Sequence, residues 1–167
     1  MRPLMTATMR PLLIFASFAF VLLIAGCDSG CRCIDPGRYG DVGEIIIFDN
    51  IDDICLEEDA AEIKAVGFNS GAVCLTVRHS GGCKRHYFRL YGASSFAKSD
   101  PPQAEIYLSH DGNGDMCEAL VGGDLVFDLG PLEEAYIQAF GGGGPVLLRI
   151  HEPGAADPIE PLPLYVF

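Results

Sequence analysis

The chain has 167 residues, of which 49% are apolar, and its 23 acidic and 11 basic residues give a formal charge of −12. This apolar content can fill a hydrophobic core, which argues against a disordered chain. The excess of negative charge repels phosphate groups and therefore argues against nucleic acid as a partner.

Residues 1–26 have the features of an export signal. A short basic start is followed by an apolar segment over residues 11–24. This segment is short for a membrane core of about 30 Å, and no basic flank follows it, so a retained transmembrane helix is the less favoured alternative. The sequence Leu23-Ile24-Ala25-Gly26-Cys27 resembles the lipobox of bacterial lipoproteins. The resemblance implies removal of residues 1–26 and attachment of fatty acyl chains, such as palmitate, at Cys27.

Lipid at Cys27 would place the protein in the bacterial cell envelope, anchored to the inner or outer membrane with its domain outside the cytoplasm. Three acyl chains together hold a protein at a membrane far more firmly than one. Removal of the signal also removes Arg2 and Arg10, which leaves 9 basic and 23 acidic residues and a net charge of −14. The mature protein is therefore expected to be strongly acidic.

Six cysteines remain beyond Cys27, and an even number in an oxidising compartment predicts up to three disulfides. Residues 27–43 are rich in turn-forming residues and are predicted to form a flexible tether. The Cys-x-Cys pair in this tether could instead bind a soft metal ion. Cys83 and Cys117 each follow a predicted turn at the start of a strand, and we expect them to pair. The six candidates for disulfides are Cys31, Cys33, Cys55, Cys74, Cys83 and Cys117.

Residues 44–167 are predicted to form one domain, because apolar and polar residues alternate in short runs separated by glycine and proline. Asn69-Ser70-Gly71 suits a hairpin turn. Residues 49–62 are predicted to form an acidic loop, residues 93–103 a second loop, and residues 131–140 a short helix that begins at a proline. The runs that predict strands are 44–48, 61–68, 72–79, 84–91, 104–110, 116–121, 124–129, 146–150 and 164–167.

About eight short strands with little helix predict an all-β fold, an antiparallel β-sandwich, with a small β-barrel as the alternative. The sequence Gly81-Gly82-Cys83, followed later by His-Asp-Gly-Asn-Gly-Asp-Met-Cys-Glu-Ala from His110, resembles a pattern in small uncharacterised β-sandwich lipoproteins. That resemblance extends over residues 44–167. It implies a fold and no activity.

Two groups of residues could bind metal. Asp111, Asn113 and Asp115 have the spacing that begins an EF-hand calcium loop, but Met116 and Gly122 replace the glycine and glutamate that such a loop needs. A polar turn is therefore the favoured interpretation, with Ca²⁺ as the alternative. The four histidines match no zinc-binding spacing and are expected to be isolated surface side chains. They are His79, His86, His110 and His151. The alternative is that His79 and His86, which flank one hairpin, approach a common site with Asp111 or Cys83, which requires several loops to converge.

The sequence contains no nucleophile elbow, phosphate-binding loop, dinucleotide fingerprint or thioredoxin motif. We therefore predict a membrane-anchored envelope lipoprotein with a non-enzymatic, disulfide-stabilised binding or structural domain of unknown ligand. Its acidic surface would face a protein partner. The alternative is an envelope protein that uses the acidic loops and His110, either to bind calcium or another metal or to act as a hydrolase.

Overall fold

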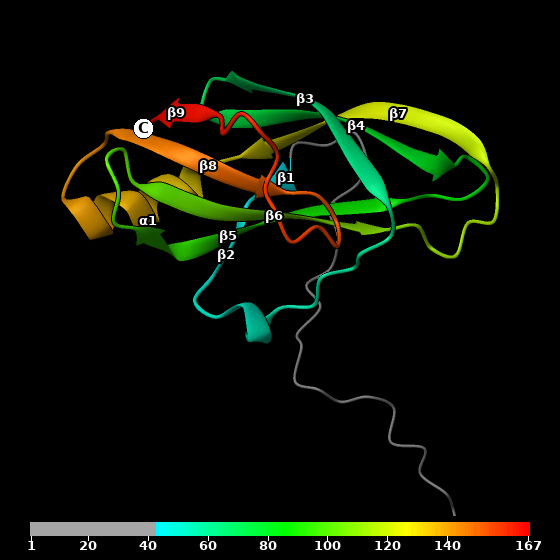
Figure 1. The fold of residues 1–167 in the computed structure, drawn as a ribbon, viewed down its shortest axis with the longest axis horizontal. Coiled ribbons are helices and arrows are strands. Elements are labelled where there is room, and N and C mark those ends of the chain that lie inside the picture. Colours follow the sequence, from blue (N-terminus) through cyan, green and yellow to red (C-terminus); the bar gives the residue numbers. More distant parts are fainter. Residues whose placement is uncertain (1–42) are drawn as a thin grey trace, which may run out of the picture.

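The computed structural model describes residues 43–167 as two sheets stacked face to face, with a short helix at one end (Figure 1). The predicted signal peptide and tether, with Cys27, Cys31 and Cys33, lie outside the described residues. The elements in chain order are β1 (Gly43–Glu44), β2 (Ile46–Phe48), the 3-10 helix η1 (Ile51–Asp53), β3 (Ala61–Asn69), β4 (Ala72–Gly81), β5 (Tyr87–Ala97), β6 (Gln103–Asp111), β7 (Ala119–Asp128), α1 (Gly130–Phe140), β8 (Pro145–His151) and β9 (Leu164–Val166).

The all-β sandwich predicted from the sequence is confirmed, as two open sheets in the orders β1-β7-β4-β3 and β2-β5-β6-β8-β9. The sheets are mixed, however, and not antiparallel throughout. The pairs β1–β7, β2–β5 and β6–β8 are parallel. Parallel neighbours need a long crossover, and β7 and α1 together supply the one between β6 and β8. The alternation of apolar residues cannot reveal whether two strands pair in parallel or antiparallel, because side chains alternate between the faces in the same way in both kinds of pair.

The core lies between the two sheets and follows the predicted alternation. Val73, Leu75 and Val77 of β4 are 0–1% exposed, while the residues between them face outward. From the other sheet, Leu90 and Ile106 are equally buried. Burial of this apolar surface is the main force that holds the sheets together.

Helix α1 closes one end of the sandwich. Pro131 stands in its first turn, and Gly141 ends it in the left-handed conformation with φ 81°. Leu132 and Tyr136 are its buried residues, and the Tyr136 ring lies 5.4 Å from the ring of Phe96 near the end of β5. The opposite end of β4 and the start of β5 are therefore far from the helix, and the site described below lies there.

Two predicted elements differ from those observed. Residues 93–97 were predicted as loop but continue β5, because Phe96 and Ala97 pair with β6. The two strands predicted over residues 116–121 and 124–129 are one strand, β7. Its pairing with β4 runs without interruption through Gly122 and Gly123, so cross-strand hydrogen bonding outweighs the local preference of a glycine pair for a turn.

The hairpin predicted at Asn69-Ser70-Gly71 is confirmed. Ser70 and Gly71 have φ values of 48° and 85°, and β3 pairs antiparallel with β4 on either side of them. Positive φ at both central residues matches the twist of the flanking strands. Among the described residues, no helix is long and apolar enough to cross a membrane.

Candidate functional site

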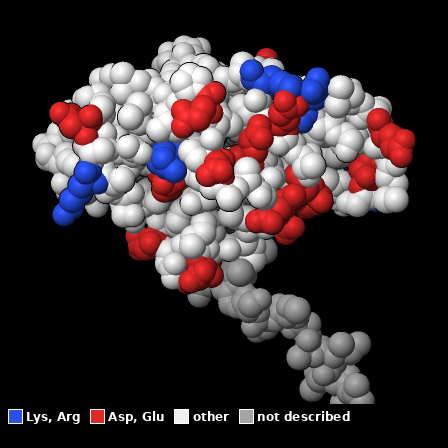
Figure 2. Space-filling model, in the orientation of Figure 1, with Lys and Arg blue, Asp and Glu red and all other residues white. Residues whose placement is uncertain are grey.

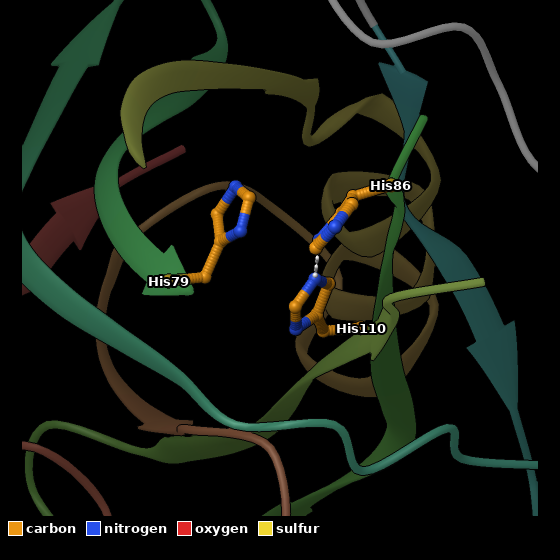
Figure 3. A group of neighbouring side chains, drawn as sticks. All are labelled: His79, His86 and His110. Atoms are coloured by element: carbon orange, nitrogen blue, oxygen red, sulfur yellow. Dashed lines mark hydrogen bonds between the residues drawn. The ribbon is translucent and has the colours of Figure 1, made fainter. Parts of the chain in front are cut away.

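Three histidines meet inside the end of the sandwich opposite α1. His79 comes from β4, His86 from the residue before β5, and His110 from β6. Their side chains converge (Figure 3), with ring centroids 4.3 Å apart for His79 and His86 and 5.0 Å apart for the other two pairs. The three residues are only 5%, 6% and 1% exposed. We call this group the histidine cluster.

The expectation of isolated surface histidines is therefore wrong. All four histidines are buried, and His151 lies outside the histidine cluster, with its Nε2 2.7 Å from Oε2 of Glu105 and its ring stacked on Tyr107. A signal for the cluster was present in the sequence. His79 stands at the next alternate position after Val73, Leu75 and Val77, which face inward. His86 and His110 also stand at inward-facing positions of the alternating runs to which they belong.

Each ring of the histidine cluster has one nitrogen bonded to an acceptor outside the cluster. Nδ1 of His79 lies 2.9 Å from the Ser80 carbonyl oxygen, and Nδ1 of His110 lies 2.9 Å from the Asp59 carbonyl oxygen. Nε2 of His86 lies 3.3 Å from Oδ2 of Asp115. Carbonyl and ionised carboxylate oxygens only accept hydrogen bonds, so these three nitrogens carry protons and donate.

The second nitrogen of each ring is thereby left without a proton when the ring is neutral. These are Nε2 of His79, Nδ1 of His86 and Nε2 of His110. Nδ1 of His86 and Nε2 of His110 are 2.8 Å apart. That separation is a hydrogen-bond distance, so the contact is stable only when one of the two nitrogens carries a proton, and a cation bound by both nitrogens could take the place of that proton.

Asp115 holds His86 from outside the cluster. Its Oδ2 accepts hydrogen bonds from the backbone N–H groups of Cys83 and Lys84, and its Oδ1 accepts one from the N–H of Cys117. These bonds, that of Cys117 above all, together with His86, hold the pKa of Asp115 well below its usual range. The side chain is only 1% exposed, so an ionised carboxylate faces His86 without competing water.

An aromatic ring and the packed interior surround the cluster on the other side. Phe88 stacks on His110 at 4.3 Å with an interplanar angle of 4°. Burial lowers the pKa of His110, and the neighbouring His79 and His86 lower it further, against the opposing effect of the Asp59 carbonyl. A lowered pKa favours the neutral imidazole, which is the form that binds metal ions.

Gly81 allows the chain to close over His86. A Cβ atom there would lie 2.5 Å from Nε2 of His86, and the φ of Gly81 is 138°, so a larger residue would displace the ring. This requirement explains the glycine at position 81.

The Cys83–Cys117 disulfide is present, as predicted, with a Cα–Cα distance of 5.9 Å. It joins the two loops whose N–H groups bind Asp115. Cys74, proposed from the sequence as a disulfide partner, is a free, half-buried cysteine. Its neighbours across the sheet are Gly67 and Val126, so no cysteine of the two adjoining strands faces it. Cys55 is also half-buried, in the segment between η1 and β3.

Asp111, Asn113 and Asp115, for which a polar turn was the favoured interpretation and a calcium loop the alternative, lie in a polar turn around a lysine. Oδ1 of Asp111 accepts a hydrogen bond from the N–H of Asn113, whose φ of 52° is followed by a φ of 58° at Gly114. Nζ of Lys84 donates to the carbonyl oxygens of Asn113 and Gly114 at 2.9 and 2.8 Å. The ammonium group thus occupies carbonyl oxygens that a loop cation would use, and Asp115 is engaged with backbone N–H groups.

The acidic loop over residues 49–62 is a solvated surface. Its seven acidic residues are all exposed; they are Asp49, Asp52, Asp53, Glu57, Glu58, Asp59 and Glu62. Figure 2 shows Asp and Glu side chains spread across the visible face, with Lys and Arg side chains in fewer places. The loop contacts the histidine cluster at His110, through the Asp59 carbonyl group on the His110 ring and through backbone hydrogen bonds of Glu57 and Asp59 with the His110 main chain.

No protein-family model matches the chain, and no curated protein matches it. Among solved structures, it is similar to a NigD-like immunity protein from Bacteroides caccae, with a TM-score of 0.53 and 20% identity. The match covers 75% of this chain and 64% of that one, so this chain spans less than two thirds of that protein's length. A lipoprotein-like protein from Bacteroides fragilis matches with a TM-score of 0.47 and 11% identity, over 75% of this chain and 68% of that one. The similarity to the NigD-like protein shows that the two proteins share a fold.

Proposed function

We propose that the protein is a lipid-anchored protein of the bacterial cell envelope whose β-sandwich is a binding module and not a catalyst. The observation that carries the proposal is the order of features along the chain. A sequence that resembles a lipobox and ends at Cys27 precedes a tether-like segment and then a domain that contains the Cys83–Cys117 disulfide. Disulfides form and persist in exported proteins, so the disulfide and the lipobox agree on the compartment.

The surface of the domain supports a protein partner. Seven exposed acidic residues lie within residues 49–62, and such a surface attracts basic protein surfaces and repels anionic lipid headgroups and nucleic acid. The NigD-like protein that shares the fold is described as an immunity protein. By analogy, we propose that this domain binds a protein partner with a basic surface.

Lipidation tests the anchoring. Cells producing the full-length chain would be grown with an alkyne analogue of palmitate, separated into membrane and soluble fractions, and compared with cells producing Cys27→Ser. We expect wild-type protein to carry the label in the membrane fraction and the variant to carry none and to retain residues 1–26. Cys74→Ser is the matched control and should be labelled like wild type. Equal labelling of Cys27→Ser and wild type would contradict the proposal.

A further inference from the structure

We propose that His79, His86 and His110 form a binding site for a late first-row transition-metal ion, with Zn²⁺ as the representative ion. The ligand atoms would be Nε2 of His79, Nδ1 of His86 and Nε2 of His110. This inference is independent of the lipid anchor and of a protein partner. It rests on the geometry of the histidine cluster alone.

The distances fit a small cation bound by three nitrogens. One ring nitrogen from each histidine can be chosen so that all three lie within 4.8 Å of one another. Zn–N bonds of about 2.0 to 2.1 Å in a tetrahedron place the nitrogens about 3.3 Å apart. The 2.8 Å between His86 and His110 and the upper limit of 4.8 Å lie on either side of that value, so the spacing of the three nitrogens brackets that of a bound ion.

The hydrogen bonds around the cluster are those that orient metal ligands. A histidine that binds a metal through one nitrogen donates its other N–H to a carbonyl or carboxylate oxygen. Here His79 and His110 donate to carbonyl oxygens, and His86 donates to the Asp115 carboxylate. When these N–H groups donate outside the cluster, the second nitrogen of each ring is the one available to a metal ion.

The donor atoms decide the class of metal. Imidazole nitrogen suits zinc, copper, nickel and iron, whereas Ca²⁺ and Mg²⁺ require mostly oxygen ligands. The buried, ionised Asp115 offsets part of the positive charge of the ion. Three protein ligands leave one tetrahedral position for water or another small ligand. The proposal therefore concerns a site that selects Zn²⁺-like ions over Ca²⁺.

The first test measures stoichiometry and affinity. Full-length protein would be purified in detergent, stripped with a chelator, dialysed and titrated with Zn²⁺ alone in competition with a chromophoric chelator. We expect one high-affinity Zn²⁺ per chain, a rise in melting temperature on binding, and no displacement by millimolar Ca²⁺. Absence of stoichiometric Zn²⁺ binding at micromolar metal would overturn the proposal. Displacement of Zn²⁺ by Ca²⁺ would also overturn it, because that result would indicate that the ion binds at the acidic loop.

Matched variants identify the ligands. His79→Gln, His86→Gln and His110→Gln each remove one ligand, and His151→Gln is the control, because His151 is equally buried and bonded to a carboxylate but lies outside the cluster. Loss of an orienting partner alone costs about 10- to 100-fold in affinity, so loss of a ligand should cost at least about 100-fold. The control should bind as wild type does. Wild-type affinity in all three cluster variants would overturn the assignment.

A measurement on wild-type protein guards against variants that fail to fold. Histidine nitrogen chemical shifts in ¹⁵N-labelled protein would be recorded before and after one equivalent of Zn²⁺. We expect the large changes at Nε2 of His79, Nδ1 of His86 and Nε2 of His110, while the opposite nitrogen of each ring keeps its proton. Unchanged shifts at these three atoms would contradict the proposal whatever the variants do.

Discussion

At the scale of single residues, Asp115 links the disulfide-bonded loops to the histidine cluster. Its carboxylate accepts three backbone N–H groups and faces His86, so it fixes which nitrogen of His86 carries the proton. Asp115 is thus a positioning residue for the proposed metal site and does not itself bind the ion.

Asp115→Asn tests this role. The amide oxygen can replace only one of the two carboxylate oxygens that accept backbone N–H groups. A neutral group also no longer stabilises the N–H of a metal-bound His86. We expect the Zn²⁺ dissociation constant to rise by about 10- to 100-fold. The melting temperature of the metal-free variant should be lower than that of metal-free wild type, and by the same amount with and without Ca²⁺. Competition titration and thermal melting would measure the two effects. Asp115→Glu should recover part of the affinity, and an unchanged dissociation constant in Asp115→Asn would contradict the role.

The alternation in residues 72–79 predicted which side of that strand faces the core, but not that three histidines meet there. His79 belongs to one sheet and His86 and His110 lie on the side of the other. Period-two alternation assigns each residue to a face, whereas contact across the sandwich depends on how the two sheets are stacked. The general rule that histidines are often exposed also conflicted with the alternation, and the alternation was correct.

At the scale of elements, the Cys83–Cys117 disulfide ties the segment before β5 to the segment before β7. The two cysteines are separated by 34 positions. In the chain-entropy model, closing a loop of this length restricts the unfolded chain and stabilises the fold by about 3 to 4 kcal/mol. The bond could be predicted from the sequence because both cysteines follow turns, whereas the parallel pairings depend on long-range topology.

Cys83→Ser combined with Cys117→Ser should therefore lower the free energy of unfolding by about 3 to 4 kcal/mol. Urea unfolding of metal-free protein, followed by circular dichroism, would measure this value. Cys74→Ser is the control, because Cys74 is half-buried and outside the disulfide, and we expect it to change stability by less than about 1 kcal/mol. If the double variant and the control were equally stable, the disulfide would contribute nothing to the fold.

At the scale of the whole molecule, residues 43–48 contribute to both sheets. β1 pairs with β7, β2 pairs with β5, and Ile45 between them is 2% exposed in the core. The alternation predicted a strand over residues 44–48 but could not show that it divides between the sheets, because a single apolar run reads the same in either case. This segment ties the two sheets together at the start of the domain.

The domain is therefore expected to fold without residues 1–42, provided that it begins at Gly43. A fragment of residues 43–167 should unfold cooperatively, with a melting temperature within a few degrees of that of the full-length chain. A second fragment beginning at Ala61 lacks Ile45 and Phe48, which are 2% and 9% exposed. Loss of one buried side chain of this kind costs about 2 to 5 kcal/mol, a large part of the 5 to 15 kcal/mol that stabilises a typical domain.

Differential scanning calorimetry and circular dichroism on the two fragments and the full-length chain would make the comparison. The fragment of residues 43–167 should also bind one Zn²⁺ per chain, because all three histidines and Asp115 lie within it. A broad, non-cooperative transition for this fragment would show that residues 1–42 contribute to the core. The domain would then begin closer to Cys27 than Gly43. Equal melting of both fragments would show instead that β1 and β2 do not join the sheets.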